Sequence, residues 1–190
     1  IIDHLANSTL QAFRAALAQA LECDLLLLLI DSSAEIPEFE RKLATSRSEI
    51  FSRYLSNEEE VTNNVLTEKS PLVVLTKAEL VDETSLQEKS ELIKELGFSQ
   101  PMAISSFSEL GLVELQNTIL MRLFGPPVGL ILHPSLTGRA IEGYVSDVYE
   151  SGLVTAKTQN DDGTINIQVW IQSQSLSKLL AHSNGRIEVK

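Results

Sequence analysis

The feature that most constrains the fold is an uninterrupted apolar run from Leu25 to Ile30, which lies between Asp24 and Asp31. The run is far shorter than the roughly 20 residues of a membrane-spanning helix, and it is also too short for a buried helix of its own. A strand is therefore predicted. Because no polar residue alternates with the apolar ones, both faces are expected to be covered, as in a central strand of a parallel sheet.

Two further apolar stretches repeat this pattern downstream. Pro71 to Leu75 predicts a second buried strand, and Met102 to Ile104 predicts a short third one. Helical periodicity separates the strands, with helices predicted at residues 10–22, 37–55, 84–96 and 110–123. This alternation is typical of parallel strands joined by right-handed crossovers. In such sheets ligands bind at the carboxyl ends of strands, which directs attention to the loops that begin at Asp31, Thr76 and Ser105.

The helix predicted at 84–96 carries signals at both ends. Thr84-x-x-Gln87 and Ser85-x-x-Glu88 both have capping-box spacing, so either hydroxyl could cap its first turn. Gly97 is expected to end the helix, because glycine adopts the left-handed conformation of a C-cap without strain. The acidic stretch at 57–60 is expected to be a solvated loop.

The pattern of predicted strands and helices changes after Gly125-Pro126-Pro127, which is expected to be a linker. Beyond it, strands are predicted at residues 128–132, 153–158, 164–171 and 186–189, and helices at 136–149 and 175–181. Asp161-Asp162-Gly163 predicts a hairpin turn. The order β-α-β-β-α-β is that of the ferredoxin-like split β-α-β module. We therefore expect an α/β domain at 1–125 and a small α+β ferredoxin-like domain at 126–190.

Composition excludes several functional classes. The net charge of −11 argues against a continuous basic face that would coat nucleic acid. A single cysteine, Cys23, excludes an internal disulfide framework, and three scattered histidines give no expected metal site. No secretory signal or membrane span is visible. We expect a monomer that is not secreted and that resides in the cytoplasm or in an organelle.

The loop Thr76-Lys77-Ala78-Glu79 directly follows the second predicted strand. Guanine-binding GTPases place Asn/Thr-Lys-x-Asp at this point. An acidic side chain accepts two parallel hydrogen bonds from the guanine N1 and N2 groups, which adenine cannot supply, and the lysine stem packs over the base. Thr76 would tie the loop to its neighbours. The alternative is an ordinary strand-to-helix loop.

A second loop lies one strand later. Ile104-Ser105-Ser106-Phe107, followed by Gly111, resembles the Ser-Ala-x loop that supports guanine with a backbone N–H. Small residues are needed there because the backbone must approach the base closely. The alternative for Ser105 and Ser106 is a helix-capping serine pair.

The opening of the chain completes this resemblance. Residues 1–13, then Ala16-Leu17 and Cys23 to Leu27, resemble the segment that follows the Asp-x-x-Gly switch in HflX-family GTPases. In that family the pattern reads Phe-Ile-x-x-Leu-Pro-His-x-Leu-x-x-Ala-Phe and later Ala-Asp-Leu-Leu-Leu. The small C-terminal module is similar to the extra domain of many members. The implied fold is an incomplete P-loop-GTPase-like parallel sheet followed by that module.

The resemblance implies a GTP- or GDP-binding protein associated with the large ribosomal subunit, in ribosome splitting, rescue or biogenesis. The implied base-binding residues are Thr76, Lys77, Glu79, Ser105, Ser106 and Phe107. Contacts with ribosomal RNA and proteins would need local basic residues, for which Lys157, Lys178, Arg186 and Lys190 on the small module are candidates.

The sequence also departs from the family pattern. Thr76 stands for the usual Asn, Glu79 for Asp, Ser106 for Ala, and Ala6-Asn7 for Pro-His. No Gly-x-x-x-x-Gly-Lys-Ser/Thr loop occurs in the 190 residues. Hydrolysis and Mg²⁺ binding are therefore expected only if a phosphate-binding half lies upstream. No catalytic residue is assigned within the chain.

Two alternatives stay open. The domain could be a degenerate, non-hydrolysing GTPase-like module that docks on the ribosome or assists its assembly. The chain could also be part of an unrelated α/β enzyme with a small ferredoxin-like domain. The sequence contains no catalytic cluster that would support this alternative.

Overall fold

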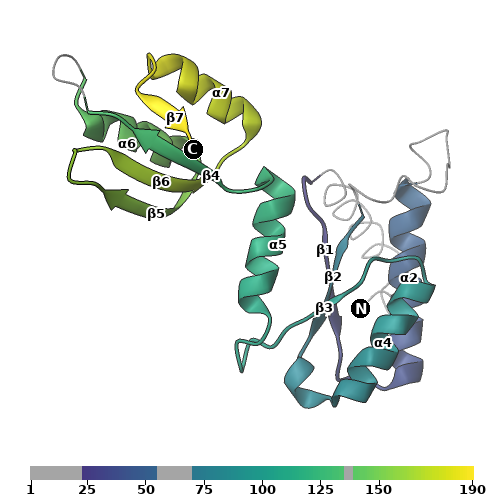
Figure 1. The fold of residues 1–190 in the computed structure, drawn as a ribbon. Coiled ribbons are helices and arrows are strands. Elements are labelled where there is room, and N and C mark those ends of the chain that lie inside the picture. The colour runs from purple at the N-terminus through teal and green to yellow at the C-terminus, as the bar shows by residue number, and fades with distance from the viewer. Residues whose placement is uncertain (1–22, 55–69, 135–138) are drawn as a thin grey trace, which may run out of the picture. The chain divides into compact units, whose positions relative to one another are not determined.

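The computed structural model describes residues 23–54, 70–134 and 139–190 (Figure 1). The chain divides into two compact units, Ile1–Gln116 and Asn117–Lys190, and each is described by itself. The division falls within helix α5 (Leu112–Phe124), and the linker expected after residue 125 stays a prediction. The predicted helix at 10–22 and loop at 57–60 lie outside the described residues.

Three parallel strands form the sheet of the first unit. They are β1 (Leu27–Asp31), β2 (Leu72–Thr76) and β3 (Met102–Ala103), in the order β1-β2-β3. The register pairs Leu27 with Leu72 and continues to Asp31 with Thr76. The polar residues that end β1 and β2 are therefore direct neighbours at the carboxyl edge.

The central strand of the described sheet is β2, and not the strand predicted to be central at 25–30. Every residue from Leu72 to Leu75 is buried, whereas Leu29 on β1 is 61% exposed. Strand β1 lies at the edge of the described sheet. An apolar run predicts a strand, but it does not reveal how many strands or helices cover that strand.

Helices α2 (Ile36–Tyr54) and α4 (Glu83–Glu95) lie on the same side of this sheet (Figure 1). Alternate residues of β1 and β2 point toward them, because side chains alternate between the faces of a strand. The resulting core consists of Ile30, Phe39, Leu43, Val73, Leu75, Ile93 and Phe98. This core packs α2 and α4 against one face of β1 and β2.

The N-cap of α4 is Asp82, and neither predicted capping box is used. The Asp82 carboxylate accepts a hydrogen bond from the Ser85 N–H at 2.8 Å. Its extended backbone, with φ −76° and ψ 164°, is the geometry of an N-cap, whereas Thr84 and Ser85 are already helical. Gly97, with φ +84°, follows the helix end as predicted.

The second unit contains β4 (Val128–Leu132), α6 (Ile141–Ser151), β5 (Leu153–Gln159), β6 (Ile165–Trp170), α7 (Ser173–His182) and β7 (Ile187–Val189). Its antiparallel strands lie in the order β5-β6-β4-β7. Strand β4 thus separates β6 from β7, so the two β-α-β segments interleave, and the predicted element order is confirmed. Gly163, with φ +82°, forms the predicted β5–β6 turn.

One boundary in this unit was predicted too early. The helix expected at 136–149 begins at Ile141, because Ala140 has an extended backbone with φ −64° and ψ 151°. Residues 136–138 lie outside the described part. The helix packs on the sheet through one apolar face, since Tyr144, Val145 and Val148 are buried in the core of this unit. Across the described residues, no helix is both long and apolar enough to cross a membrane.

Candidate functional site

The carboxyl edge of the parallel sheet brings three loops together. Asp31 is the last residue of β1, Thr76 is the last residue of β2, and Ile104 directly follows β3. The Ala78 N–H donates to the Ile104 carbonyl oxygen at 3.0 Å, which joins the second loop to the third. Hydrogen bonds from Ser32 to Thr76 join the first loop to the second. The sheet thus creates one polar site from segments that are far apart in sequence.

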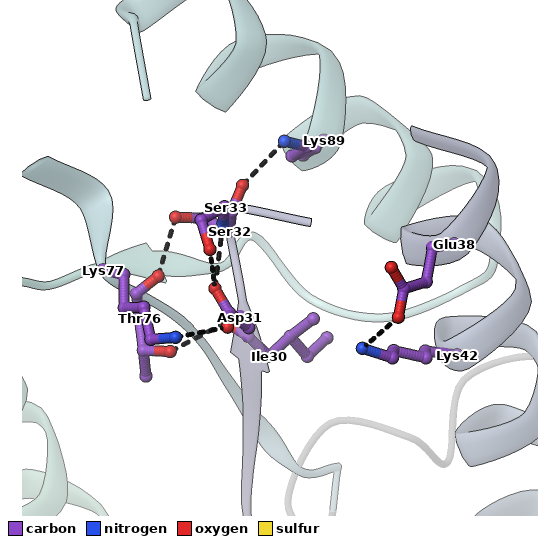
Figure 2. Close-up of polar contacts among 9 residues, drawn as sticks. All are labelled: Ile30, Asp31, Ser32, Ser33, Glu38, Lys42, Thr76, Lys77 and Lys89. Atoms are coloured by element: carbon purple, nitrogen blue, oxygen red, sulfur yellow. Dashed lines mark hydrogen bonds and ion pairs between the residues drawn. The ribbon is translucent and has the colours of Figure 1, made fainter. Parts of the chain in front are cut away.

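Lys77 adopts a left-handed backbone conformation, with φ 59° and ψ 36°. For a residue with a Cβ this conformation costs about 1–2 kcal/mol, so the surrounding contacts must hold it. Its Nζ contacts Asp31 Oδ2 at 2.6 Å (Figure 2). The lysine stem is therefore fixed along the carboxyl edge, although more than half of the side-chain surface stays exposed.

Asp31 was predicted to start one of the loops at this edge, but no partner for its carboxylate was predicted. Its hydrogen bond with Lys77 is the largest cause that lowers the pKa of this carboxyl to about 2, and the Ser33 hydroxyl adds to the effect. Ser33 donates to Oδ1 from both N–H, at 2.9 Å, and Oγ, at 2.6 Å. The acid that ends the first strand was the available signal, but its partner depends on the strand register.

Thr76 points back toward β1. Its hydroxyl donates to the Ile30 carbonyl oxygen at 3.2 Å. Its own carbonyl oxygen accepts from the Ser32 N–H at 3.0 Å and from the Ser32 hydroxyl at 2.7 Å (Figure 2). Thr76 therefore ties the Lys77 loop to the neighbouring strand.

Glu79 is exposed in a short 3-10 helix, η2 (Ala78–Leu80). Within the described part of the chain, its carboxylate has no hydrogen bond or ion pair. The preceding Ala78 is buried and bonded to the third loop, so the backbone that carries Glu79 is anchored. The structure therefore presents this carboxylate to solvent from a fixed position.

The three residues of the third loop have different environments. Ser105 is completely buried, and its Oγ accepts from the N–H groups of Phe107, at 3.2 Å, and Ser108, at 3.0 Å. It stabilises the turn before α5 from inside the protein. Ser106 is exposed, and Phe107 is 88% exposed. Of the two serines, only Ser106 is therefore accessible to a ligand.

The four candidate basic residues of the second unit lie on different elements. Lys157 is on β5, Lys178 on α7, and Arg186 and Lys190 flank β7. Lys157, Lys178 and Lys190 are exposed, whereas the Arg186 guanidinium donates to the Pro134 carbonyl oxygen at 3.3 Å. They stay candidates for contacts with a polyanion.

No family model matches the chain. The chain is 24% identical over 182 residues to the GTPase HflX of Thermofilum pendens. The match covers 96% of this chain and 39% of that protein, so the chain spans about two fifths of the length of this relative. At this identity the match supports a relationship to GTPases and nothing narrower.

The fold agrees with that coarse relationship. A three-stranded parallel sheet and a small antiparallel sheet are consistent with part of a GTPase-like domain followed by a small domain. The segments at 76–79 and 105–107 lie together at the carboxyl edge, where α/β sheets bind ligands.

Proposed function

We propose that this chain is the base-binding part of an HflX-like guanine-nucleotide-binding protein. The observation that carries the proposal is the anchored loop at 76–79. Its lysine is fixed by Asp31, its Ala78 N–H is bonded to the third loop, and its Glu79 carboxylate is left accessible. The similarity to a GTPase along 96% of the chain supports the same function.

In this proposal each exposed group has a defined task. Glu79 accepts two hydrogen bonds from the guanine N1 and N2 groups, and the Lys77 stem covers one face of the base. The exposed Phe107 ring offers the other face a stacking partner. Thr76, Ser105 and Ser106 shape the two loops, and Ser106 is exposed where it can contact the base.

The phosphates and Mg²⁺ of GTP or GDP need residues of another kind. A glycine-rich loop ending in Lys-Ser/Thr normally supplies backbone N–H groups to the phosphates and a hydroxyl to the metal. The 190 residues contain no such motif. We therefore assign the recognition of the base to this chain and the phosphate contacts to residues outside it.

The decisive experiment is a titration of the full-length protein with fluorescent GDP and ADP, compared with its Glu79→Ala variant. Loss of charge-assisted hydrogen bonds should weaken GDP binding by about 10- to 100-fold and leave weak ADP binding unchanged. Glu88→Ala, which removes another exposed carboxylate of the same region, is the matched control. Equal GDP affinity in the Glu79→Ala and Glu88→Ala variants would mean that Glu79 does not read the base.

The second candidate is a GTPase-like module that does not hydrolyse GTP. Two departures from the usual base-binding motif support it, Thr76 for Asn and the longer Glu79 for Asp, because they are expected to weaken guanine binding. GTP turnover by the full-length protein, measured as released phosphate, separates the two candidates. Turnover that depends on Glu79 would eliminate the second.

We also propose the large ribosomal subunit as the partner, on the strength of the HflX resemblance. The test is cosedimentation of the full-length protein with purified large subunits, with GTP, with GDP and without nucleotide. Replacing Lys157, Lys178 and Lys190 by glutamine should weaken the association, because these exposed cations are candidates for phosphate contacts. Absence of cosedimentation under all three conditions would refute this partner.

A further inference from the structure

A buried lysine lies next to the site, and the proposed function does not use it. Lys89 of α4 is only 3% exposed, and its Nζ lies 5.7 Å from the centroid of the Phe39 ring. The ammonium donates to the Ser32 carbonyl oxygen at 2.7 Å (Figure 2). Among the described residues, no carboxylate pairs with it. A buried cation is costly, and an apolar side chain of similar size would serve packing equally well.

The Ser32–Ser33 peptide is held at both of its polar ends. Its carbonyl oxygen accepts from Lys89, and its N–H, which belongs to Ser33, donates to Asp31 Oδ1 at 2.9 Å. Hydrogen bonds in such a chain polarise one another, so a cation on the carbonyl strengthens the N–H as a donor. Lys89 therefore influences the orientation of the Asp31 carboxylate through one peptide group.

Asp31 and Ser32 then pass this constraint to the 76–79 loop. The second carboxylate oxygen of Asp31 binds Lys77 Nζ at 2.6 Å. The fully buried Ser32 donates both its N–H and its hydroxyl to the Thr76 carbonyl oxygen, directly before Lys77. The residues that make these contacts are Ser32, which belongs to the peptide that Lys89 binds, and Asp31, which directly precedes it.

We propose that Lys89 is a positioning residue for the Lys77 loop. Its ammonium fixes the Ser32–Ser33 peptide, which orients Asp31, and Asp31 holds Lys77 in its left-handed conformation. The consequence for base recognition rests on the proposed function. The contacts that connect Lys89 with the loop do not depend on the proposed function, so the positioning role and the binding role can be tested separately.

The test compares Lys89→Met with Lys94→Met in the full-length protein. Lys94 lies on the same helix with an exposed ammonium paired with Glu91, so its loss removes a lysine outside the network. Amide hydrogen exchange at Ser33 and Ala78 should accelerate about tenfold or more in Lys89→Met only, relative to α4 amides of the same protein. Unchanged exchange at both amides would overturn the proposal.

GDP binding by single and double variants separates a positioning role of Lys89 from a general effect on stability. Lys89→Met should weaken fluorescent GDP binding by about fivefold, and it should add no further loss in an Asp31→Asn background, because both residues act on Lys77 through one path. Additive losses would overturn the proposal. If the wild-type protein binds neither GDP nor GTP, the proposed function fails. The hydrogen-exchange comparison of Lys89→Met with Lys94→Met then still decides whether Lys89 positions the loop.

Ser32→Ala gives an independent check in case the Lys89 variant does not fold. It removes the hydroxyl donor to Thr76 and keeps the Ser32 carbonyl for Lys89. Exchange at Ala78 should again accelerate, but less than in Lys89→Met, because the Ser32 N–H still donates to Thr76. Full protection of Ala78 in this variant would contradict the proposed path.

Discussion

At the scale of single residues, the site depends on a few polar contacts that fix an unfavourable backbone. Lys77 has a left-handed conformation that most residues avoid, and Asp31 is its ionic partner at 2.6 Å. A strained backbone of this kind persists only where the surrounding contacts hold it, and it is often found at binding sites. The unusual conformation of Lys77 therefore agrees with a binding role for the loop.

The Asp31–Lys77 contact predicts how stability depends on pH. The hydrogen bond with Lys77 lowers the pKa of Asp31 from 3.8 to about 2. Because the folded-state pKa is lowered, the contribution is fully present well above pH 3.8 and is lost as the pH falls toward about 2. Since the Asp31 side chain is 37% exposed, we expect at most about 1 kcal/mol.

Urea unfolding of the wild type and of Asp31→Asn as a function of pH measures this contribution. The two free energies of unfolding should differ by a constant amount at neutral pH and converge near pH 2. A difference that persists unchanged at pH 2 would assign the effect of the substitution to something other than the charge.

Replacing Phe107 is expected to change nucleotide binding without changing the stability of the fold. The ring is 88% exposed, so Phe107→Ala should change the free energy of unfolding by no more than about 0.5 kcal/mol. If the ring stacks on the base, the same variant should lose about 1–3 kcal/mol of GDP binding, the range for base–aromatic stacking. Phe107→Tyr, which keeps an aromatic face, should retain the affinity. Unchanged affinity in Phe107→Ala would remove the ring from the site.

At the scale of elements, the third loop depends on a close approach between Gly111 and β3. Gly111 has φ +70°, and a Cβ added there would lie 2.3 Å from the Ala103 carbonyl oxygen. Gly111→Ala should therefore lower the free energy of unfolding by more than about 2 kcal/mol, because a backbone clash is added to the left-handed strain.

Gly97→Ala is the matched control for this substitution. Gly97 has φ +84°, and a Cβ there would meet no atom within 4 Å, so only the conformational cost of about 1 kcal/mol is expected. Thermal or urea unfolding of the two variants measures the difference. Equal destabilisation would show that the contact with Ala103 is relieved at little cost.

At the scale of the whole molecule, each compact unit has its own apolar core. Leu132 is buried in the core of the second unit, and Leu75 is buried in that of the first. Leu132→Ala should cost the second unit about 2–5 kcal/mol, and Leu75→Ala should cost the first unit a similar amount.

Hydrogen exchange resolved by peptide tests this independence. Leu132→Ala should accelerate exchange in peptides from 128–190 and leave those from 72–104 protected, and Leu75→Ala should do the reverse. Loss of protection in both regions with either substitution would mean that the units unfold together.

The amino-acid sequence by itself determined most local structure. Apolar runs located the strands at 72–76 and 102–103, and Asp-Asp-Gly located the β5–β6 turn. These features depend on residues that are neighbours in the chain. The sequence also identified the loops at 76–79 and 105–107, whose role in binding guanine stays a prediction.

Only the tertiary structure decided that β1 lies at the edge of the described sheet, that Asp31 pairs with Lys77, and that Lys89 is buried beside Ser32. The reason is physical. Asp31 and Lys77 lie 46 positions apart, and Lys89 and Ser32 lie 57 apart. These contacts exist because the parallel register and the packing of α4 bring the residues together, and no local pattern records that register.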